Sequence, residues 1–161
     1  MSSARYLTAV AVFAALALLL IHSLREDRRH LHEHIAVLAV MYLLRAVIML
    51  LTPLANAHGE GAFVFPLVQY GMFPSGHSAA VLLCVRLTDP ARAPGLRRLM
   101  FGLAATVWIA LIVSRGHYSI DVVGGMLLAY FVDMEWRHGR LFGPVTRWVR
   151  SGSFRPDQPA S

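Results

Sequence analysis

The sequence predicts an all-α membrane protein, a polytopic bundle of about five transmembrane helices. Of its 161 residues, 57% are hydrophobic and 15% are charged, whereas soluble domains average roughly 45–50% and about 25%. The apolar residues also gather in runs of nearly membrane length, and a helical span needs about 20 mostly apolar residues. We therefore expect residues 1–161 to form a single integral membrane domain, with no room for a large catalytic domain outside the membrane.

Two long apolar runs open the chain. Residues 6–24 follow Arg5, so they fit either a signal peptide or an uncleaved spanning helix. The length of this run favours the spanning helix, and so does the absence of a small-x-small cleavage motif before the charged residues 25–29. The second run covers residues 35–54 and is interrupted only by Arg45.

Three further helices are expected in the second half of the chain. Residues 55–75 are rich in Gly and aromatic residues and contain two Pro residues, which predicts a re-entrant or surface loop. A third helix is expected from Pro74 to about Leu87, which is short for a full crossing. The fourth and fifth helices are expected over residues 99–114 and 119–136.

The end of the chain has a different composition. Residues 137–161 are rich in Arg, Gly and Pro, which predicts a basic cytoplasmic tail that is frayed and amphipathic at the membrane surface. Such a tail can hold anionic lipid head groups. We expect the membrane to be a partner of this chain and nucleic acid not to be one.

The Arg residues predict the orientation, because the cytoplasmic ends of spans carry an excess of basic residues. All fifteen basic residues are Arg, and twelve of them follow the first, third and fifth expected helices. We therefore expect the N-terminus outside and the C-terminus in the cytoplasm. The start of the third helix and the junction between the fourth and fifth helices then share the outer face.

The junction between the fourth and fifth helices reads Ser-Arg-Gly-His-Tyr-Ser-Ile-Asp over residues 114–121. His117 and Asp121 are four residues apart, so on a helix they share one face and the carboxylate can accept a hydrogen bond from the imidazole. The other ring nitrogen is then free to act as a nucleophile or general base. Arg115 offers a planar fork of donors that matches phosphate oxygens. The alternative is an interfacial His beside a helix-capping Asp.

The start of the third helix is the second candidate segment. Free backbone N–H groups at a helix start bind anions, and Gly76 allows a ligand to approach closely. Ser75 and Ser78 can add hydroxyl donors, and His77 would stand beside a bound phosphate. A turn followed by a helix cap is the alternative interpretation.

Arg45 is the third candidate. A guanidinium near the bilayer centre costs at least about 2.5–3.5 kcal/mol on insertion scales, so this side chain must face a polar cavity or an acidic partner. It is either a phosphate clamp at the bottom of the site, or a buried ion pair or snorkelling side chain.

The remaining polar groups favour structural roles. The single Cys84 excludes a disulfide framework and a cysteine-based metal site. The His-rich residues 30–34 lie among charges on the inner loop, and His58 and Glu60 belong to the outer loop. We therefore expect no metal and no cofactor.

Two further pairs of residues are expected to have structural roles. Asp133 and Glu135 fall near the inner end of the fifth helix, where we expect them to pair with Arg137 or Arg140. Gly124-Gly125 predicts a close helix contact.

Two groups of residues resemble signature motifs of the type 2 phosphatidic acid phosphatase superfamily. They are the string Pro74-Ser75-Gly76-His77 and the set of Ser114, Arg115, His117 and Asp121. The usual pattern has five residues between the Ser-Arg pair and its His, whereas here only Gly116 intervenes. The first signature of the superfamily begins with a Lys, and this chain contains none.

The sphingomyelin synthase branch of this superfamily is more similar. It carries a His-Tyr-Thr-x-Asp string, which here reads His-Tyr-Ser-Ile-Asp over residues 117–121, and a Ser-Gly-His-Thr string, which here reads Ser-Gly-His-Ser over residues 75–78. Arg45 and Thr52 also match its Arg and Thr spacing. Met72 departs from the branch, which commonly has Asp there. The resemblance covers residues 45–132, the expected catalytic core.

The resemblance implies metal-independent transfer through a phosphohistidine. His117 would attack phosphorus while Asp121 holds its far nitrogen, and His77 would protonate the leaving lipid oxygen and then activate the acceptor. Arg115, Arg45 and the groups around Ser75 and Gly76 would bind the phosphate oxygens.

Three functions remain open at this point. The first is sphingomyelin synthase-like transfer of a phospho-head group from a phospholipid to a lipid alcohol. The second is a lipid phosphate phosphatase that acts on phosphatidic acid or a prenyl diphosphate with water as acceptor. The third is a non-catalytic lipid-binding membrane protein. We expect the site on the periplasmic face of a bacterial inner membrane.

Overall fold

The computed structural model describes residues 2–25, 30–51, 73–113, 119–139 and 141–152, and every structural statement below concerns these residues. They form helices and no strand, so the all-α prediction is confirmed. The helices are α1 (Ser2–Arg25), α2 (Leu31–Leu51), α3 (Gly76–Leu87), α4 (Pro94–Val113), α5 (Ser119–His138) and α6 (Gly143–Gly152).

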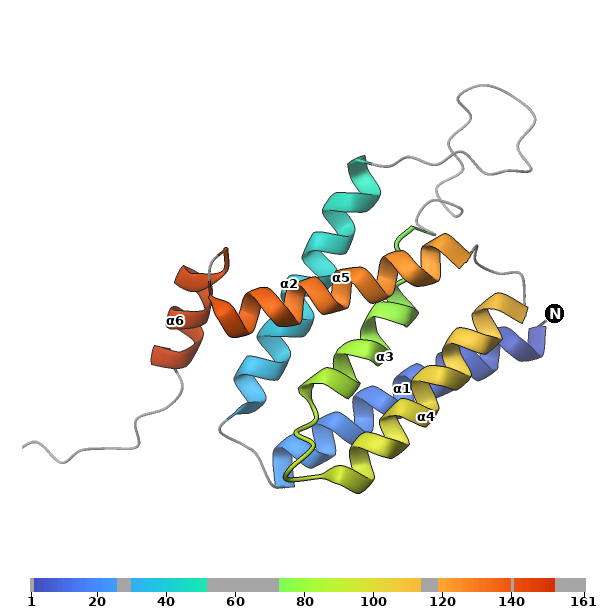
Figure 1. Ribbon diagram of the computed structural model, residues 1–161, viewed down its shortest axis with the longest axis horizontal. Helices are drawn as coiled ribbons and strands as arrows, with labels where there is room; N and C mark the ends of the chain where they lie inside the picture. The colour runs from blue at the N-terminus through green and yellow to red at the C-terminus, as the bar shows by residue number, and fades with distance from the viewer. Residues whose placement is uncertain (1, 26–29, 52–72, 114–118, 140, 153–161) are drawn as a thin grey trace, which may run out of the picture.

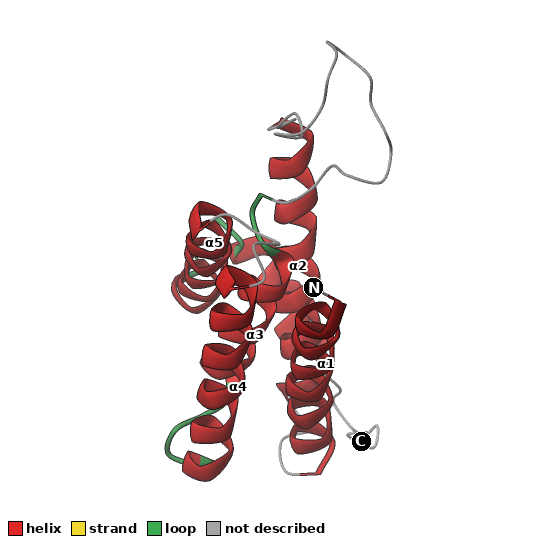
Figure 2. Cartoon of the chain, turned by 90° about the vertical axis from the view of Figure 1, so that its right-hand side faces the viewer, coloured by secondary structure: helices red, strands yellow, loops and turns green. Residues whose placement is uncertain are grey.

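The short helix α3 forms the centre of the bundle. It contacts α1, α2, α4 and α5, while α1 and α4 lie along each other on one side (Figures 1 and 2). Ala79, Ala80, Leu83 and Cys84 are completely buried. Small side chains in the first turns of α3 let neighbouring helices approach closely, so this helix is covered along most of its length.

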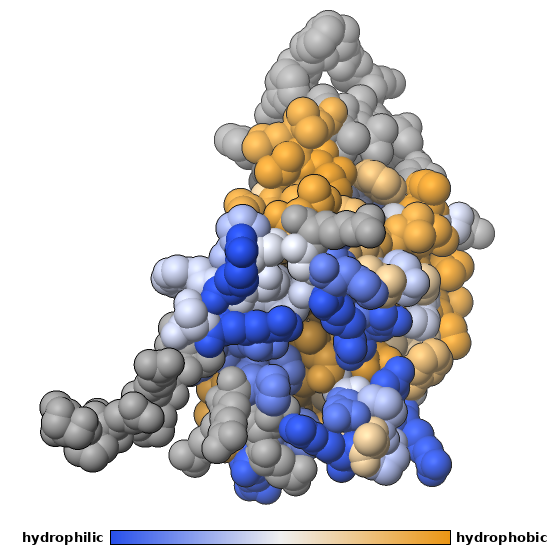
Figure 3. Space-filling model, turned by 60° about the vertical axis from the view of Figure 1, so that its left-hand side comes forward, coloured by the Kyte–Doolittle hydropathy of each residue, from blue (hydrophilic) through white to orange (hydrophobic). Residues whose placement is uncertain are grey.

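Three of the described helices are long and apolar enough to cross a membrane, at Tyr6–Arg25, Leu31–Leu51 and Pro94–Val113. Large apolar side chains are exposed on these helices: Phe13 is 72% exposed and Leu50 is 82% exposed. Apolar residues likewise cover the upper part of the surface in Figure 3. These features support an integral membrane protein.

The other two expected spans are less apolar or shorter. Helix α3 has twelve residues, and α5 carries Asp121 and Asp133, which are 1% and 2% exposed. Because these carboxylates are buried against other helices, they lower the hydropathy of α5 without facing the surroundings. Five full crossings remain a prediction.

Several helix boundaries differ from the expected ones. Helix α4 begins at Pro94 rather than at residue 99, because Pro is well suited to the first helical position, where no N–H partner is needed. Helices α1 and α2 begin about one turn before their apolar runs. Helix α5 begins at Ser119 as predicted.

The expected amphipathic tail segment is a helix over part of its length. In α6, Thr146 and Val149 are buried, whereas Trp148 is 75% exposed. The helix contacts α2 and α5, and Arg150 Nε lies 3.1 Å from Glu33 Oε1. Residues 153–161 lie outside the described part.

A polar cluster joins the C-terminal ends of α3 and α5. Asp133 accepts hydrogen bonds from Arg86 Nε at 2.7 Å and from Arg137 Nε at 2.8 Å. Arg137 also donates to the Arg86 carbonyl at 2.8 Å. The predicted pairing of Asp133 with Arg137 is confirmed, and Arg86 is an additional partner. Arg140 lies outside the described residues, and Glu135 accepts a hydrogen bond from the Leu141 amide.

Replacing Asp133 with Asn is expected to lower stability by about 1–3 kcal/mol, since two guanidinium groups lose a shared buried carboxylate but are themselves partly exposed. The thermal unfolding midpoint in detergent measures this loss. Asp89→Asn is the matched control, because Asp89 is exposed and its oxygen lies 3.5 Å from Arg92 Nε. Equal midpoints for the two variants would contradict the structural role of Asp133.

Candidate active site

The first turn of α3 meets the first turn of α5. The Ser75 amide donates a hydrogen bond to the Asp121 carbonyl at 2.9 Å, and the Ser78 hydroxyl donates to the Val122 carbonyl at 2.8 Å. Both Ser residues are fully buried. The start of α3 therefore meets Asp121 and Val122, which lie more than forty residues later in the sequence.

The pair Gly124-Gly125 makes this close approach feasible. A Cβ atom at Gly125 would overlap the Ser75 carbonyl oxygen and lie 3.0 Å from Ser78 Cβ. A Cβ atom at Gly124 would lie 2.5 Å from the ring of Phe73. The predicted packing role of these glycines is confirmed by this contact.

Ser75 is the N-cap of α3. Its side-chain oxygen accepts a hydrogen bond from the Ser78 amide at 3.4 Å, which satisfies one of the free N–H groups at a helix start. The capping interpretation of this segment is therefore correct for Ser75. A capped N-terminus still carries a partial positive charge, which favours a bound anion.

Arg45 reaches this N-terminus from α2. Its Nε donates a hydrogen bond to the Pro74 carbonyl at 2.9 Å. A Cβ atom at Gly76 would lie 2.9 Å from the same Nε and 3.2 Å from Cζ, so the guanidinium lies directly against Gly76. Arg45 therefore lies at the start of α3, and its role as a phosphate clamp stays a prediction.

A cavity of about 300 Å³ opens beside these groups. Its polar lining consists of Tyr42, Arg45, Gly76 and His77, and the His77 side chain is exposed. The opposite wall is the apolar face of α1, formed by Ala9, Val12, Phe13 and Leu16. A few polar groups at one end of an apolar cavity match a ligand with a charged head and an apolar tail.

Asp121 is buried at the start of α5, on the element that meets Ser75. The other members of its sequence segment, Arg115 and His117, lie outside the described residues. Thr52, His58, Glu60 and Met72 lie outside them as well. The structure thus brings Arg45, Ser75, Gly76, His77 and Asp121 to one end of the bundle.

The α1 wall could not be predicted, because its residues look like any others of an apolar span: Ala9, Val12, Phe13 and Leu16. A role for Tyr42 at the site was weakly indicated by the sequence, since this residue precedes Arg45 by three positions and lies on the same face of the helix. In the described part of the chain, no three His, Cys, Asp or Glu side chains gather as a metal site would require. The His-rich residues 30–34 form no such group.

The described helices form an apolar bundle that suggests an integral membrane protein, and its cavity sets Arg45 and the start of α3 beside an apolar wall from α1. Residues 72–138, which include α3, α4 and α5, match the family model described as PAP2 superfamily C-terminal. This match supports the type 2 phosphatidic acid phosphatase superfamily for this segment, and with it a lipid phosphatase or phosphotransferase enzyme. A search of curated proteins found no match, and a search of solved structures found none.

Gly125→Ala is expected to separate the starts of α3 and α5, because the new methyl group meets the Ser75 backbone and the Ser78 side chain. Overpacking of this kind costs about 1–3 kcal/mol, and a displacement of about 1 Å in a catalytic site can reduce turnover about 100-fold. Unfolding midpoints and lipid phosphate turnover measure the two effects.

Gly102→Ala is the matched control, since a Cβ atom there has no neighbour within 4 Å. It is expected to preserve both the midpoint and the turnover. A Gly125→Ala protein with the activity and stability of this control would show that the close contact is not required.

Proposed function

We propose that this protein transfers the phospho-head group of a phospholipid to a lipid alcohol through a phosphohistidine, as in the sphingomyelin synthase branch. The observation that carries the proposal is the cavity beside His77, which combines Arg45 and the start of α3 with an apolar wall from α1. The family match over residues 72–138 supports the broader activity on lipid phosphate bonds.

The first half of the proposed reaction moves the phospho-head group to the protein. A ring nitrogen of His117 attacks phosphorus, and the bond from phosphorus to the lipid oxygen breaks. His77 donates a proton to that oxygen, so the diacylglycerol leaves as a neutral alcohol. Asp121 holds the far nitrogen of His117 and stabilises its positive charge. His117 and Asp121 are four residues apart in the sequence, which is close enough for their side chains to meet as this step requires.

The second half regenerates the protein. The acceptor hydroxyl gives its proton to the now neutral His77, and its oxygen attacks phosphorus. The bond from phosphorus to His117 then breaks, which releases the new phosphoester and restores both histidines. A lipid alcohol such as ceramide or diacylglycerol as acceptor makes the reaction a transfer.

Stabilisation of negative charge is the largest contribution expected from the protein. Arg45 lies against Gly76, and the N-terminus of α3 adds its partial positive charge. Arg115 is proposed as a second guanidinium on the phosphate oxygens. A guanidinium fork binds two oxygens at once, which holds the phosphorus in line for attack.

Water is the alternative acceptor, and the protein is then a lipid phosphate phosphatase for phosphatidic acid or a prenyl diphosphate. Met72 favours this alternative, because the sphingomyelin synthase branch commonly has Asp at that place. The exposed side chain of His77 also favours it, since water can reach the group that would activate it. Both alternatives share the first half of the reaction.

We propose the periplasmic face of a bacterial inner membrane as the location of this site. The starts of α3 and α5 meet at one end of the bundle, whereas Arg86, Arg97 and Arg137 line a separate cavity at the end of α3, the start of α4 and the end of α5. Because basic residues are enriched at the cytoplasmic ends of spans, this distribution supports an outward-facing site.

A product census tests the proposal. The wild type, His117→Ala and His77→Ala are incubated with phosphatidic acid, prenyl diphosphate, phosphatidylcholine, phosphatidylethanolamine and ceramide, and the products are identified by phosphorus NMR and lipid mass spectrometry. His117→Ala is expected to abolish turnover, and His77→Ala to reduce it about 10²–10⁴-fold. His32→Ala, an exposed His near the opposite end of α2, is the control and is expected to keep wild-type turnover.

The products distinguish the acceptors. Diacylglycerol together with a new ceramide phospholipid identifies a transferase, whereas inorganic phosphate identifies a phosphatase. The same products and rates from the wild type and His117→Ala would contradict both forms. Lipid binding without conversion in every protein would identify the non-catalytic alternative.

A further inference from the structure

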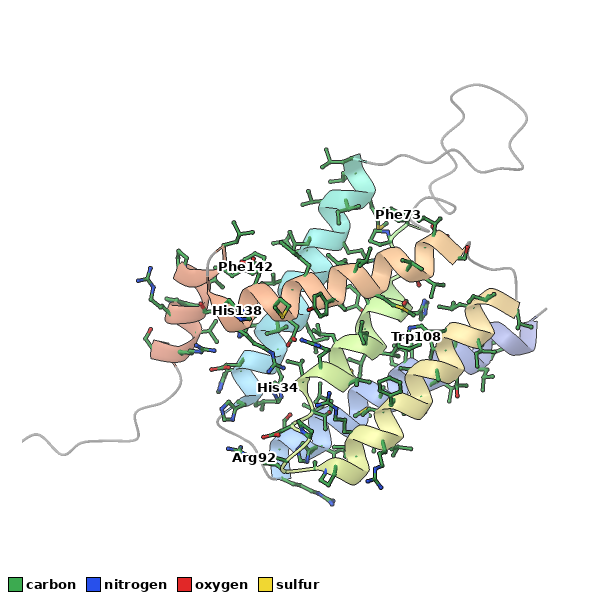
Figure 4. The ribbon with its side chains drawn as sticks, viewed as in Figure 1. His34, Phe73, Arg92, Trp108, His138 and Phe142 are labelled. Atoms are coloured by element: carbon green, nitrogen blue, oxygen red, sulfur yellow. The ribbon has the colours of Figure 1, made fainter. Side chains whose placement is uncertain are left out.

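A second and larger cavity lies at the end of the bundle opposite His77. Its volume is about 440 Å³, and its charged lining includes Arg86, Arg92, Arg97, Arg137, His34 and Asp89. Arg86 is nine residues after His77 on α3, so about 14 Å of helix separates the two ends. Figure 4 shows His34 and Arg92 at this end and Phe73 at the other.

The cavity has an excess of positive charge. Arg86 and Arg137 share the single carboxylate of Asp133. Arg92 lies 3.5 Å from the Asp89 carboxylate, and both side chains are exposed. The described lining of the cavity thus contains four guanidinium groups and two imidazoles, with Asp89 as its carboxylate.

Arg97 lines the cavity and has a long contact with the protein. Its Nη1 lies 3.5 Å from the Thr88 carbonyl oxygen, which is the limit of a hydrogen bond. A guanidinium fork is well matched to the oxygens of a phosphate group. Hydrophilic residues gather over this part of the surface in Figure 3.

We propose that this cavity binds the phosphate group of an anionic phospholipid, from the leaflet opposite the catalytic site. Basic pockets between the cytoplasmic ends of spans are suited to lipid head groups. Ile35 on α2 and Leu99 on α4 are 54% and 50% exposed, so the helices that carry His34 and Arg97 also expose apolar side chains. A water-soluble phosphate shares this chemistry and is the second source to be tested.

Such a ligand would join four separate parts of the chain. His34 belongs to the start of α2, Arg92 to the loop before α4, Arg97 to α4 and Arg137 to α5. A ligand that binds only the folded state stabilises it by mass action. The expected consequence is that anionic lipid raises the unfolding temperature through this site.

The test uses the full chain in detergent, in a His117→Ala background so that added lipid is not consumed. Short-chain phosphatidylglycerol, phosphatidylcholine and inorganic phosphate are titrated separately, and binding is followed by the unfolding midpoint and by native mass spectrometry. Phosphatidylglycerol is expected to raise the midpoint. Arg97→Gln is expected to weaken its affinity about tenfold, because it removes a charge-assisted hydrogen bond.

Arg98→Gln is the matched control, because Arg98 is exposed, follows Arg97 directly and does not line the cavity. It is expected to bind phosphatidylglycerol like the background protein. The double variant Arg92→Gln with Arg97→Gln is expected to bind more weakly than Arg97→Gln alone. If the double variant does not fold, the single variant Arg97→Gln still tests the proposal.

The outcomes separate the sources. An equal response to inorganic phosphate, also lost in Arg97→Gln, supports the phosphate site with a water-soluble source. A response to phosphatidylglycerol alone supports the lipid source. Unchanged affinity in Arg97→Gln would overturn the proposal, because the phosphate would then not be bound by Arg97. An equal loss in Arg97→Gln and Arg98→Gln would also overturn it, because binding would then follow the net charge of the protein rather than the cavity.

Discussion

The contact between the starts of α3 and α5 is the constraint on which the rest of this structure depends. The Ser75 amide and the Ser78 hydroxyl donate to the carbonyls of Asp121 and Val122, and this approach requires a residue without Cβ at Gly125. These hydrogen bonds form in a buried, low-dielectric environment, so the loss of either would leave a buried polar group unsatisfied and lower the stability of the fold. The position of Asp121 relative to the first turn of α3 follows from them.

The distribution of polar groups explains how a short chain combines a membrane bundle with a polar site. Asp121 and Asp133 occupy the two ends of α5 and are buried against other helices. Asp133 holds the C-terminal ends of α3 and α5 together through Arg86 and Arg137. The outer surface remains apolar, so each end of the bundle carries polar groups while its lateral surface suits a membrane.

Much of this arrangement follows from the sequence, because hydrophobic runs and helix signals are local. The helices, the start of α5, the cap at Ser75 and the pairing of Asp133 with Arg137 were all predictable. The α1 wall and the pairing of Arg86 with Asp133 were not, because they depend on which helix faces of the bundle meet. His117 and Arg115 lie outside the described residues, so their roles rest on the resemblance and remain proposals.

The measurement that tests the central claim most directly is the capture of the phosphorylated protein. Purified wild type and His117→Ala are mixed with phosphorus-32-labelled phosphatidic acid or phosphatidylcholine, quenched rapidly in alkali and digested for mass spectrometry. The account predicts an acid-labile, alkali-stable phosphoramidate on His117, present in the wild type and absent from His117→Ala. Turnover of either lipid with no labelled histidine, or with the same label in both proteins, would contradict it.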